Sequence, residues 1–243
     1  MSPENRTALA AWCEQWLGAV PRQVLFERGH SSRVIGVALT DGRLVVVKVR
    51  APAPRITGCV AVQRGLFGAG FPCPEPLAGP LPWGDDVATA ETLLPGGAPR
   101  TIDGHAPEAF AMLLAVLISS APPVPAVPSL EPSPPWVGWA HDGAGVWPQP
   151  DDLEVDLNVH PGPAWLDELG GRIRARIAGS TTQPVIVGHG DWESHNIGWQ
   201  GSTALAVFDW DSVVALSEVC HRRRCGDGLP IRRAGGCRHR RPN

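Results

Sequence analysis

The sequence contains no tyrosine, and only one of its 21 basic residues, Lys48, is a lysine. Long apolar runs are also missing, since the longest spans residues 109–118 and is too short to cross a bilayer. The chain does not open with a basic segment followed by an apolar stretch, so we expect no signal peptide. Its six cysteines lack the pattern of a secreted disulfide scaffold, which favours a reduced, cytoplasmic protein.

Two short acidic segments each follow an apolar, strand-like run. Residues 185–187 lead into a loop with Asp191 and Asn196, and residues 204–208 lead to Asp209. Asp191 can accept the proton of an attacking hydroxyl, whereas Asn196 and Asp209 can offer oxygen atoms to Mg²⁺. Phosphoryl transfer uses such a set, because the enzyme positions a hydroxyl and neutralises phosphate charge. Polar hairpin loops with incidental acids are the alternative interpretation.

The lone lysine lies in a β-branched run, residues 44–49, after an Asp-Gly dipeptide that favours a two-residue hairpin turn. Lysine suits a phosphate because it is a compact point charge on a flexible stem. A lysine on an edge strand facing water is the alternative. Earlier in the chain, Ser31 and Ser32 lie in a loop whose hydroxyl and N–H groups can cover phosphate, although an ordinary hairpin loop would read the same.

The pattern His-Gly-Asp-Trp-x-x-x-Asn at residues 189–196, followed by Phe-Asp-Trp-Asp at residues 208–211, resembles the aminoglycoside phosphotransferase and choline kinase family. The resemblance covers roughly residues 20–218. It implies an α+β, bilobal, protein-kinase-like fold with an antiparallel β-sheet N-lobe and a mainly helical C-lobe. It also implies that Lys48 contacts the α- and β-phosphates of ATP, and that backbone groups near Glu91 and Leu93 meet the adenine at the hinge between the lobes.

The same resemblance suggests a division of the chain and an activity. We expect an N-lobe with the nucleotide-binding sheet in residues 1–95, a C-lobe with the catalytic and metal loops in residues 96–219, and an arginine-rich tail in residues 220–243. The implied reaction moves the γ-phosphoryl group of ATP, with GTP as an alternative, to a hydroxyl of a small molecule in the presence of Mg²⁺. Neither the acceptor nor the oligomeric state follows from the sequence, and we expect no membrane partner.

One element that the family usually has is missing from its expected place. A glutamate on the helix after the Lys48 strand normally pairs with the lysine, yet residues 51–70 contain no acid, and Gln63 is the nearest polar candidate. The landmark after that helix is present as Gly-Phe-Pro-Cys-Pro at residues 70–74. We therefore expect Lys48 to lack an acidic partner. The alternative function is therefore that of a catalytically impaired, pseudokinase-like nucleotide binder with a truncated C-lobe.

Periodicity predicts further elements. A first helix begins near Pro3, a second spans residues 107–119, and a third lies before the catalytic strand. One face of the first helix carries Leu9, Trp12, Cys13, Trp16 and Leu17. The third carries an apolar stripe that we expect in the core: Leu166, Leu169, Ile173 and Ile177. Seven prolines between residues 122 and 135 predict a loop or polyproline structure. Acids at 151, 152, 154 and 156 fit a solvated loop or the attraction of a cationic substrate.

The tail, residues 220–243, holds eight arginines and one acid. Three interpretations are open. Its cysteines and histidines could bind zinc, although their spacing is not that of a standard finger. Its arginines could bind nucleic acid, which gives a third, less favoured function. We favour a disordered or off-frame extension, because the segment has no hydrophobic periodicity. In that case the helices that complete the substrate cleft in the family would be absent.

Overall fold

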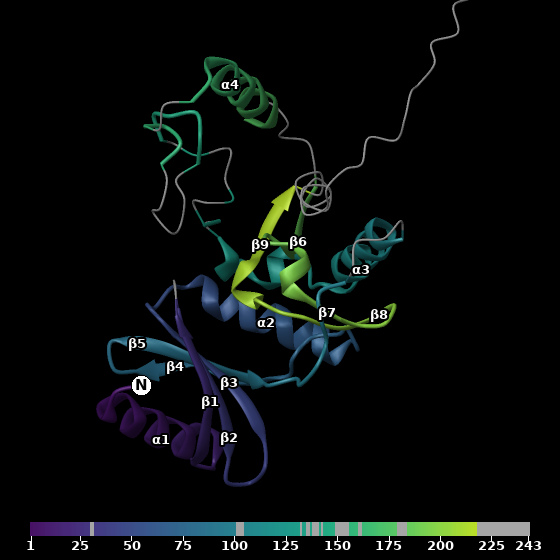
Figure 1. Cartoon of the computed structure of the whole chain (residues 1–243). Coiled ribbons are helices and arrows are strands. Elements are labelled where there is room, and N and C mark those ends of the chain that lie inside the picture. Colours follow the sequence, from purple (N-terminus) through teal and green to yellow (C-terminus); the bar gives the residue numbers. More distant parts are fainter. Residues whose placement is uncertain are drawn as a thin grey trace, which may run out of the picture.

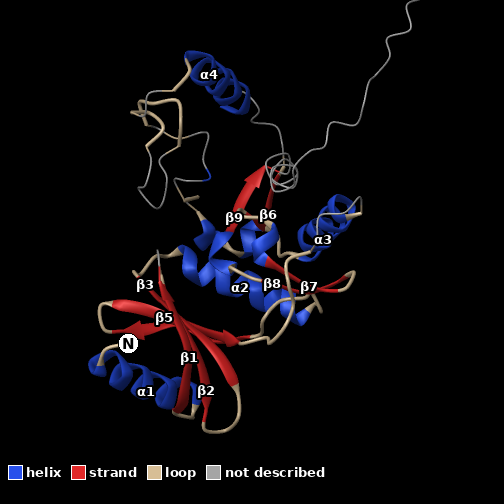
Figure 2. Cartoon of the chain, in the orientation of Figure 1, coloured by secondary structure: helices blue, strands red, loops and turns tan. Residues whose placement is uncertain are grey.

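The computed structural model describes residues 1–29, 32–100, 105–131, 133–134, 137, 141, 143–148, 156–159, 162–178 and 184–217. Two lobes are visible, with the five-stranded sheet and the first helix in one and the remaining helices and strands in the other (Figures 1 and 2). This α+β arrangement confirms the predicted fold class. The boundary near residue 95 stays a prediction. None of the helices in the described segments is long and apolar enough to cross a membrane.

The N-terminal helix, α1 (Pro3–Leu17), covers one face of the sheet. The Ser2 hydroxyl caps the helix by accepting the Asn5 N–H at 3.2 Å, and Gly18 ends it in the left-handed conformation with φ 72°. The predicted apolar face is buried except at Trp16, which is 39% exposed. Trp16 is the most exposed residue of this face, because the sheet contacts a narrower stripe than the whole apolar face.

The sheet is antiparallel with strand order β1-β2-β3-β5-β4. Its strands are β1 (Pro21–Gly29), β2 (Arg33–Leu39), β3 (Leu44–Arg50), β4 (Pro76–Trp83) and β5 (Asp86–Thr92). Side chains alternate between the two faces of a strand. On β3 this puts Val45, Val47 and Val49 in the core under α1, so Lys48 and Arg50 lie on the opposite face, toward the second lobe.

The turn between β2 and β3 is longer than predicted. The Gly42 N–H donates to the carbonyl of Leu39 at 3.1 Å, and the Leu39 N–H donates to that of Arg43 at 2.8 Å. Gly42 has φ 90°, a conformation that suits glycine. The expected two-residue turn was therefore wrong. Three residues, 40–42, lie between Leu39 and Arg43, with the glycine in the position that this kind of hairpin favours.

The helix between β3 and β4, α2 (Arg55–Gly68), packs against the second lobe. Its buried side chains Cys59, Val62 and Leu66 share a core with Phe110 of the next helix and with tryptophans of the C-terminal strands. A prediction from chain position alone would assign α2 to the first lobe, whereas its apolar face belongs to the core of the second.

The second lobe contains α3 (Ala106–Ser120), α4 (Ala164–Ala178) and four short strands. Antiparallel pairs form between β6 (Val185–His189) and β9 (Val213–Ser217), and between β7 (Ile197–Gln200) and β8 (Thr203–Val207). Single turns of 3₁₀ helix cover η1 (Val124–Ala126), η2 (Pro128–Leu130), η4 (Ser194–Asn196) and η5 (Trp210–Ser212). The proline-rich segment thus includes helical turns rather than only loop or polyproline, because proline is tolerated at the start of a turn.

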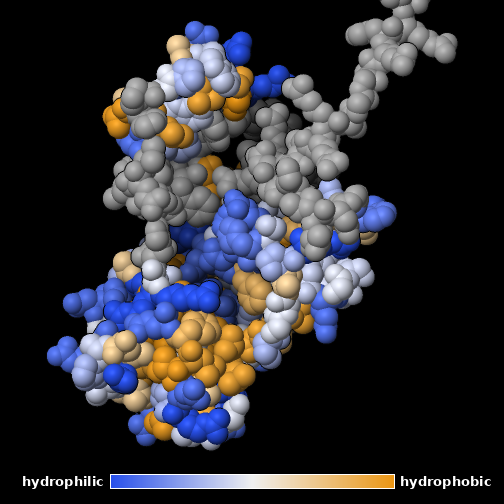
Figure 3. All heavy atoms as spheres, viewed as in Figure 1, coloured by the Kyte–Doolittle hydropathy of each residue, from blue (hydrophilic) through white to orange (hydrophobic). Residues whose placement is uncertain are grey.

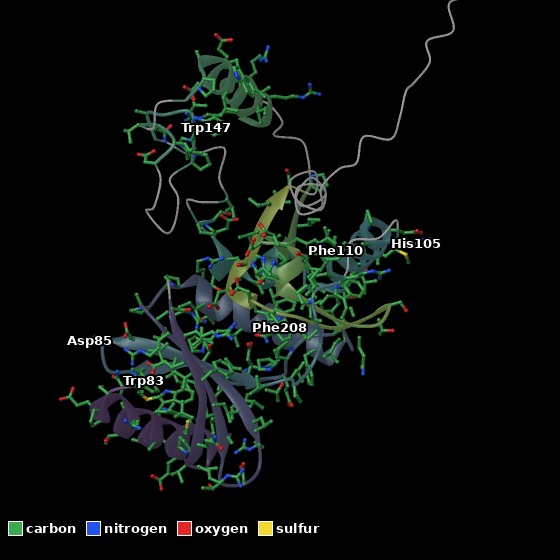
Figure 4. The ribbon with its side chains drawn as sticks, in the orientation of Figure 1. Trp83, Asp85, His105, Phe110, Trp147 and Phe208 are labelled. Carbon is green, nitrogen blue, oxygen red and sulfur yellow. The ribbon has the colours of Figure 1, made fainter. Side chains whose placement is uncertain are left out.

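At Leu166, Leu169 and Ile173 the apolar stripe of α4 is not part of the core, so the prediction was wrong for these residues, and the Ile177 side chain lies outside the described part. Leu169 is 37% exposed, and Leu166 and Ile173 are half-buried. The helix instead contacts a nearby loop, where Trp147 Nε1 donates to Asp167 Oδ1 at 2.7 Å (Figure 4). The helix therefore contacts this loop, whereas its sequence pattern predicted contact with the core. The calls on Asp151, Asp152, Glu154 and residues 220–243 fall outside the described residues.

Candidate active site

The loop after β6 holds the predicted catalytic base. Asp191 lies two residues beyond the strand, and its side chain is 34% exposed. Asn196, five residues on, turns back so that its amide Nδ2 donates to Asp191 Oδ2 at 2.8 Å and to the Asp191 carbonyl at 3.0 Å. The donation engages one carboxylate oxygen of Asp191 and leaves the other open to a further donor. It also turns Oδ1 of Asn196, the atom that could bind a cation, away from Asp191.

The second acidic loop follows β8. Asp209 has φ 60° and ψ 55°, and it is the one non-glycine residue with positive φ among the described residues. Asp tolerates this left-handed conformation better than most residues, although it costs on the order of 1–3 kcal/mol. Ser212 holds it in place, since its hydroxyl donates to Asp209 Oδ2 at 2.8 Å and its N–H donates to the Asp209 carbonyl at 3.0 Å. Such local strain is typical of functional sites.

Hydrogen bonds join the two loops. His189, at the end of β6, is fully buried and bonds through Nε2 to the carbonyl of Phe208 at 3.0 Å. Its Nδ1 accepts the Asp191 N–H at 3.2 Å, so the ring is neutral with its proton on Nε2. Burial lowers the pKa of His189, which agrees with this neutral form, although the Asp209 carboxylate opposes the shift. The Phe208 N–H also donates to the Asn196 carbonyl at 2.8 Å.

Phe208 therefore connects the two loops through its own backbone, and Figure 4 shows it between the sheet and the second lobe. The three predicted residues Asp191, Asn196 and Asp209 come together in this way, although they arise from different loops. Their roles stay predictions.

Lys48 lies on the inner face of the sheet, with its side chain 12% exposed. Its Nζ is 3.4 Å from Oε1 of Glu91, which comes from β5 and is 11% exposed. Burial would lower the pKa of Lys48, but the carboxylates of Glu91, Asp211 and Asp209 outweigh burial and raise it. The ammonium therefore stays charged inside the protein. The influence of Asp209 and Asp211 also means that the lysine faces the second acidic loop.

The expectation that Lys48 has no acidic partner was wrong. The search for that partner covered only the helix after β3, where residues 51–70 indeed have no acid. In the structure the partner is Glu91, which lies on β5, the strand paired with β3. Gln63 lies on α2, the helix on which an acid was expected, and donates to Glu91 Oε2 at 2.9 Å. The helix therefore contacts Glu91, the partner of Lys48.

Two arginines that the sequence did not single out hold the second acidic loop. Arg50, two residues after Lys48, pairs with Asp211 at 2.7 Å. Arg55, at the start of α2, donates to the backbone carbonyls of Asp211 at 2.7 Å and Val213 at 2.6 Å. The surface where the lobes meet is mostly hydrophilic in Figure 3. Arg50 could have been found from the alternation of β3, because it shares the face of Lys48.

The nucleotide-loop prediction is described only in part. Ser31 lies outside the described residues, whereas Ser32 lines a cavity of about 460 Å³ together with Arg28, Arg33 and Arg50. The hinge residues are less available than expected. The Leu93 N–H donates to the Leu44 carbonyl at 2.9 Å, and the Glu91 side chain is turned to Lys48. The Leu93 N–H is thus already engaged, and its carbonyl is the group that it can offer to adenine. Adenine contacts by Glu91 and Leu93 stay predictions.

A cation site is compatible with the side chains present. Among the residues that the structure describes, no group of three His, Cys, Asp or Glu side chains is arranged to hold a metal. Asp209 and the Asn196 amide nevertheless supply two oxygen donors from adjacent loops. Mg²⁺ suits such a site, since it usually keeps several waters and takes one or two carboxylates plus phosphate oxygens.

No curated protein matches the sequence. Solved structures with the same fold include a thermostable mutant of aminoglycoside phosphotransferase APH(4)-Ia, in a ternary complex with ADP and hygromycin B, at 15% identity and a TM-score of 0.56. That match covers 87% of this chain and 74% of the other.

Two further structures share the fold. Macrolide 2'-phosphotransferase MphH from Brachybacterium faecium has 16% identity and a TM-score of 0.55, over 94% of this chain and 79% of the other. Amicoumacin kinase hAmiN, in complex with AMP-PNP, Ca²⁺ and Ami, has 12% identity and a TM-score of 0.56, over 94% and 71%.

The model of the phosphotransferase enzyme family (APH) matches residues 22–215. This range is most of the chain and includes both acidic loops and Lys48. The chain therefore belongs to the phosphotransferase enzyme family.

Proposed function

We propose that this protein transfers the γ-phosphoryl group of ATP to a hydroxyl group of a small molecule, with Mg²⁺ as cofactor. The observation that carries the proposal is the convergence of Asp191, Asn196 and Asp209 on two hydrogen-bonded loops that face a buried, charged Lys48. The family match supports the reaction class. ATP is the proposed donor because similar structures hold ADP or AMP-PNP, and no observation favours GTP.

In the proposed reaction the acceptor hydroxyl lies against the free carboxylate oxygen of Asp191. The hydroxyl oxygen forms a bond to the γ-phosphorus as the bond to the ADP oxygen breaks, and Asp191 takes the hydroxyl proton. Lys48 binds the α- and β-phosphates. Asn196 orients Asp191 through its amide and, with Asp209, would hold Mg²⁺, which when bound neutralises phosphate charge. Asp191 thus acts on the acceptor and Lys48 on the donor.

The acceptor is a small molecule in this proposal. The similar structures are of proteins whose names refer to aminoglycosides, macrolides and amicoumacin, which are hydroxyl-bearing compounds of different shapes. We therefore propose an alcohol acceptor without choosing among them. We also propose a cytoplasmic location, where ATP is supplied, in agreement with the free and buried Cys13, Cys59 and Cys73.

Of the two arguments for an impaired, pseudokinase-like function, a missing acid for Lys48 and a truncated C-lobe, the contact with Glu91 speaks against the first. The decisive test is turnover. We expect ADP release and a phosphorylated product, detected by mass spectrometry, with at least one compound from a panel of small alcohols and amino sugars. Asp191→Asn should lower kcat by roughly 10²–10⁴ while nucleotide affinity changes little, because the base faces the acceptor.

Glu193→Gln is a matched control, since this carboxylate in the same loop is 54% exposed and is not assigned a role in the reaction. Turnover that is equal in wild type and Asp191→Asn would remove Asp191 from the mechanism. If wild type releases no ADP with any acceptor but binds Mg-AMP-PNP in calorimetry, the nucleotide-binding alternative replaces the enzyme.

A further inference from the structure

The contact between Lys48 and Glu91 is fixed from two sides. One carboxylate oxygen, Oε1, lies 3.4 Å from Lys48 Nζ, and the other, Oε2, accepts a hydrogen bond from Gln63 Nε2 at 2.9 Å. Gln63 is itself 3% exposed and also donates through Nε2 to the Pro74 carbonyl at 2.9 Å. The carboxylate therefore has both oxygens engaged, and its neighbour on α2 is anchored as well.

The geometry of the sheet explains why this acid can replace one on the helix. Lys48 is paired with Thr89 on β5, so Glu91 is two residues farther along the same strand and on the same face. Diagonal neighbours on one face of a sheet are within reach of long side chains. Lys48, Gln63 and Glu91 also line one small cavity, which places a β3, an α2 and a β5 side chain around a common point.

The amide of Gln63 is the group that this arrangement needs. A carboxylate in its place would bring a second negative charge to Glu91 in a nearly buried site, and like charges at that distance oppose each other's ionisation. An amide instead donates to Glu91 and keeps its charge satisfied. A buried ammonium without Glu91 would be costly, because an unpaired charge in the interior is strongly disfavoured.

We propose that Glu91 is the positioning residue of Lys48 and that Gln63 holds Glu91, so that the acid which the family usually has on the helix is supplied here by β5. Only the consequence for ATP rests on the proposed function. The pairing itself can be tested without any reaction, because Lys48 is the only lysine in the chain and an amine label on a lysine side chain reports on it alone.

The first test measures the rate of reductive methylation of Lys48 at mildly alkaline pH, with the peptide quantified by mass spectrometry. Glu91→Gln should lower the pKa of Lys48 and increase the rate, roughly tenfold for each unit by which the pKa falls. A double variant, Gln63→Glu with Glu91→Gln, is the exchange variant. It moves the acid from β5 to α2 and keeps one acid and one amide in the site. It should return the rate toward that of wild type.

Glu75→Gln is the matched control, because the Glu75 side chain is exposed just before β4. The methylation rate of Lys48 in this variant should equal that of wild type. Thermal melting of each variant ensures that faster labelling does not arise from unfolding. If Glu91→Gln does not fold, Glu91→Asp withdraws the carboxylate by one methylene and should raise the rate less. A Lys48 rate in the folded Glu91 variant equal to the control, or no recovery in the exchange variant, would overturn the proposal.

The second test uses turnover. Glu91→Gln should lower kcat/KM for ATP by roughly 10²-fold, because a small displacement of a phosphate-binding group is enough for such a loss, and the exchange variant should recover most of it. Unchanged turnover in Glu91→Gln contradicts the positioning role. A wild type without turnover contradicts the proposed function instead, and the labelling result then decides the Lys48–Glu91 pairing separately.

Discussion

The two charged sides of the site are built in opposite ways. On the sheet, Lys48 and Glu91 are 12% and 11% exposed, and Glu91 is also held by Gln63. In the loop after β6, Asp191 is 34% exposed, and one of its carboxylate oxygens remains available. The side that binds a donor with many charges is buried and fixed, whereas the side that must admit a variable acceptor is open. In the proposed reaction the buried side positions the donor, and the open side carries the residue that takes the proton.

The same difference separates stability from function. Removing one partner of a buried pair destabilises the fold as well as the binding site, because the other charge is then left unpaired in the interior. An exposed acid contributes little to folding, since water can solvate it. Substitutions on the open side should thus reduce activity or binding with the fold intact, and substitutions among the buried contacts should reduce the free energy of unfolding as well.

The largest effect is expected at Asp209. Asp209→Asn removes the charged ligand but retains a residue type that tolerates the left-handed conformation. Mg²⁺-dependent affinity for AMP-PNP should fall by at least roughly 10²-fold in calorimetry, while the melting temperature stays close to that of wild type. Asp85→Asn, on the exposed turn between β4 and β5, is the control and should bind as wild type does (Figure 4). Wild-type affinity in Asp209→Asn would exclude this residue as a metal ligand.

A smaller effect is expected between Arg50 and Asp211, on the buried side. The 2.7 Å pair joins β3 to η5 and is flanked by Arg55, which holds the Asp211 carbonyl. A double-mutant cycle with Arg50→Met and Asp211→Asn should give a coupling energy of roughly 0.5–3 kcal/mol in urea unfolding. Arg43 and Asp41 form a more exposed pair and serve as the matched control, with an expected coupling of about 0.2–1 kcal/mol. Equal couplings would mean that the inner pair gains nothing from its burial.

Much of this architecture could be predicted from local patterns. The β-branched run around Lys48 and the apolar runs before Asp191 and Asp209 correctly predicted strands, because alternation and side-chain type report on a strand directly. The end of each strand then located the polar loops. These are properties of neighbouring residues in the chain, and the sequence contains them in full.

What sequence reasoning missed depends on contacts between distant segments. Glu91 and Lys48 are 43 positions apart, and only the β3–β5 register brings them to one face. The Arg55 contacts with the carbonyls of Asp211 and Val213 have no sequence signal, because any residue presents a carbonyl. The error at α4 has a similar origin, since the loop that contacts this helix at Asp167 comes from Trp147, 20 positions earlier in the chain.

The smallest effect concerns pH and tests the buried side through His189. Burial lowers the pKa of this neutral histidine below its ordinary value of 6.5. Below that pH the unfolded chain gains a proton at this residue and the native state does not, so stability falls as pH falls. For one proton the slope reaches at most about 1.4 kcal/mol per pH unit.

His189→Gln can keep a donor for Phe208 and an acceptor for the Asp191 N–H without titrating. Urea unfolding between pH 5 and pH 7.5, a window of about one unit or more to either side of that ordinary value, should therefore show a shallower decline in His189→Gln than in wild type. Parallel declines would mean that His189 takes up its proton in the native state too, and the neutral ring that joins the two loops would then be wrong.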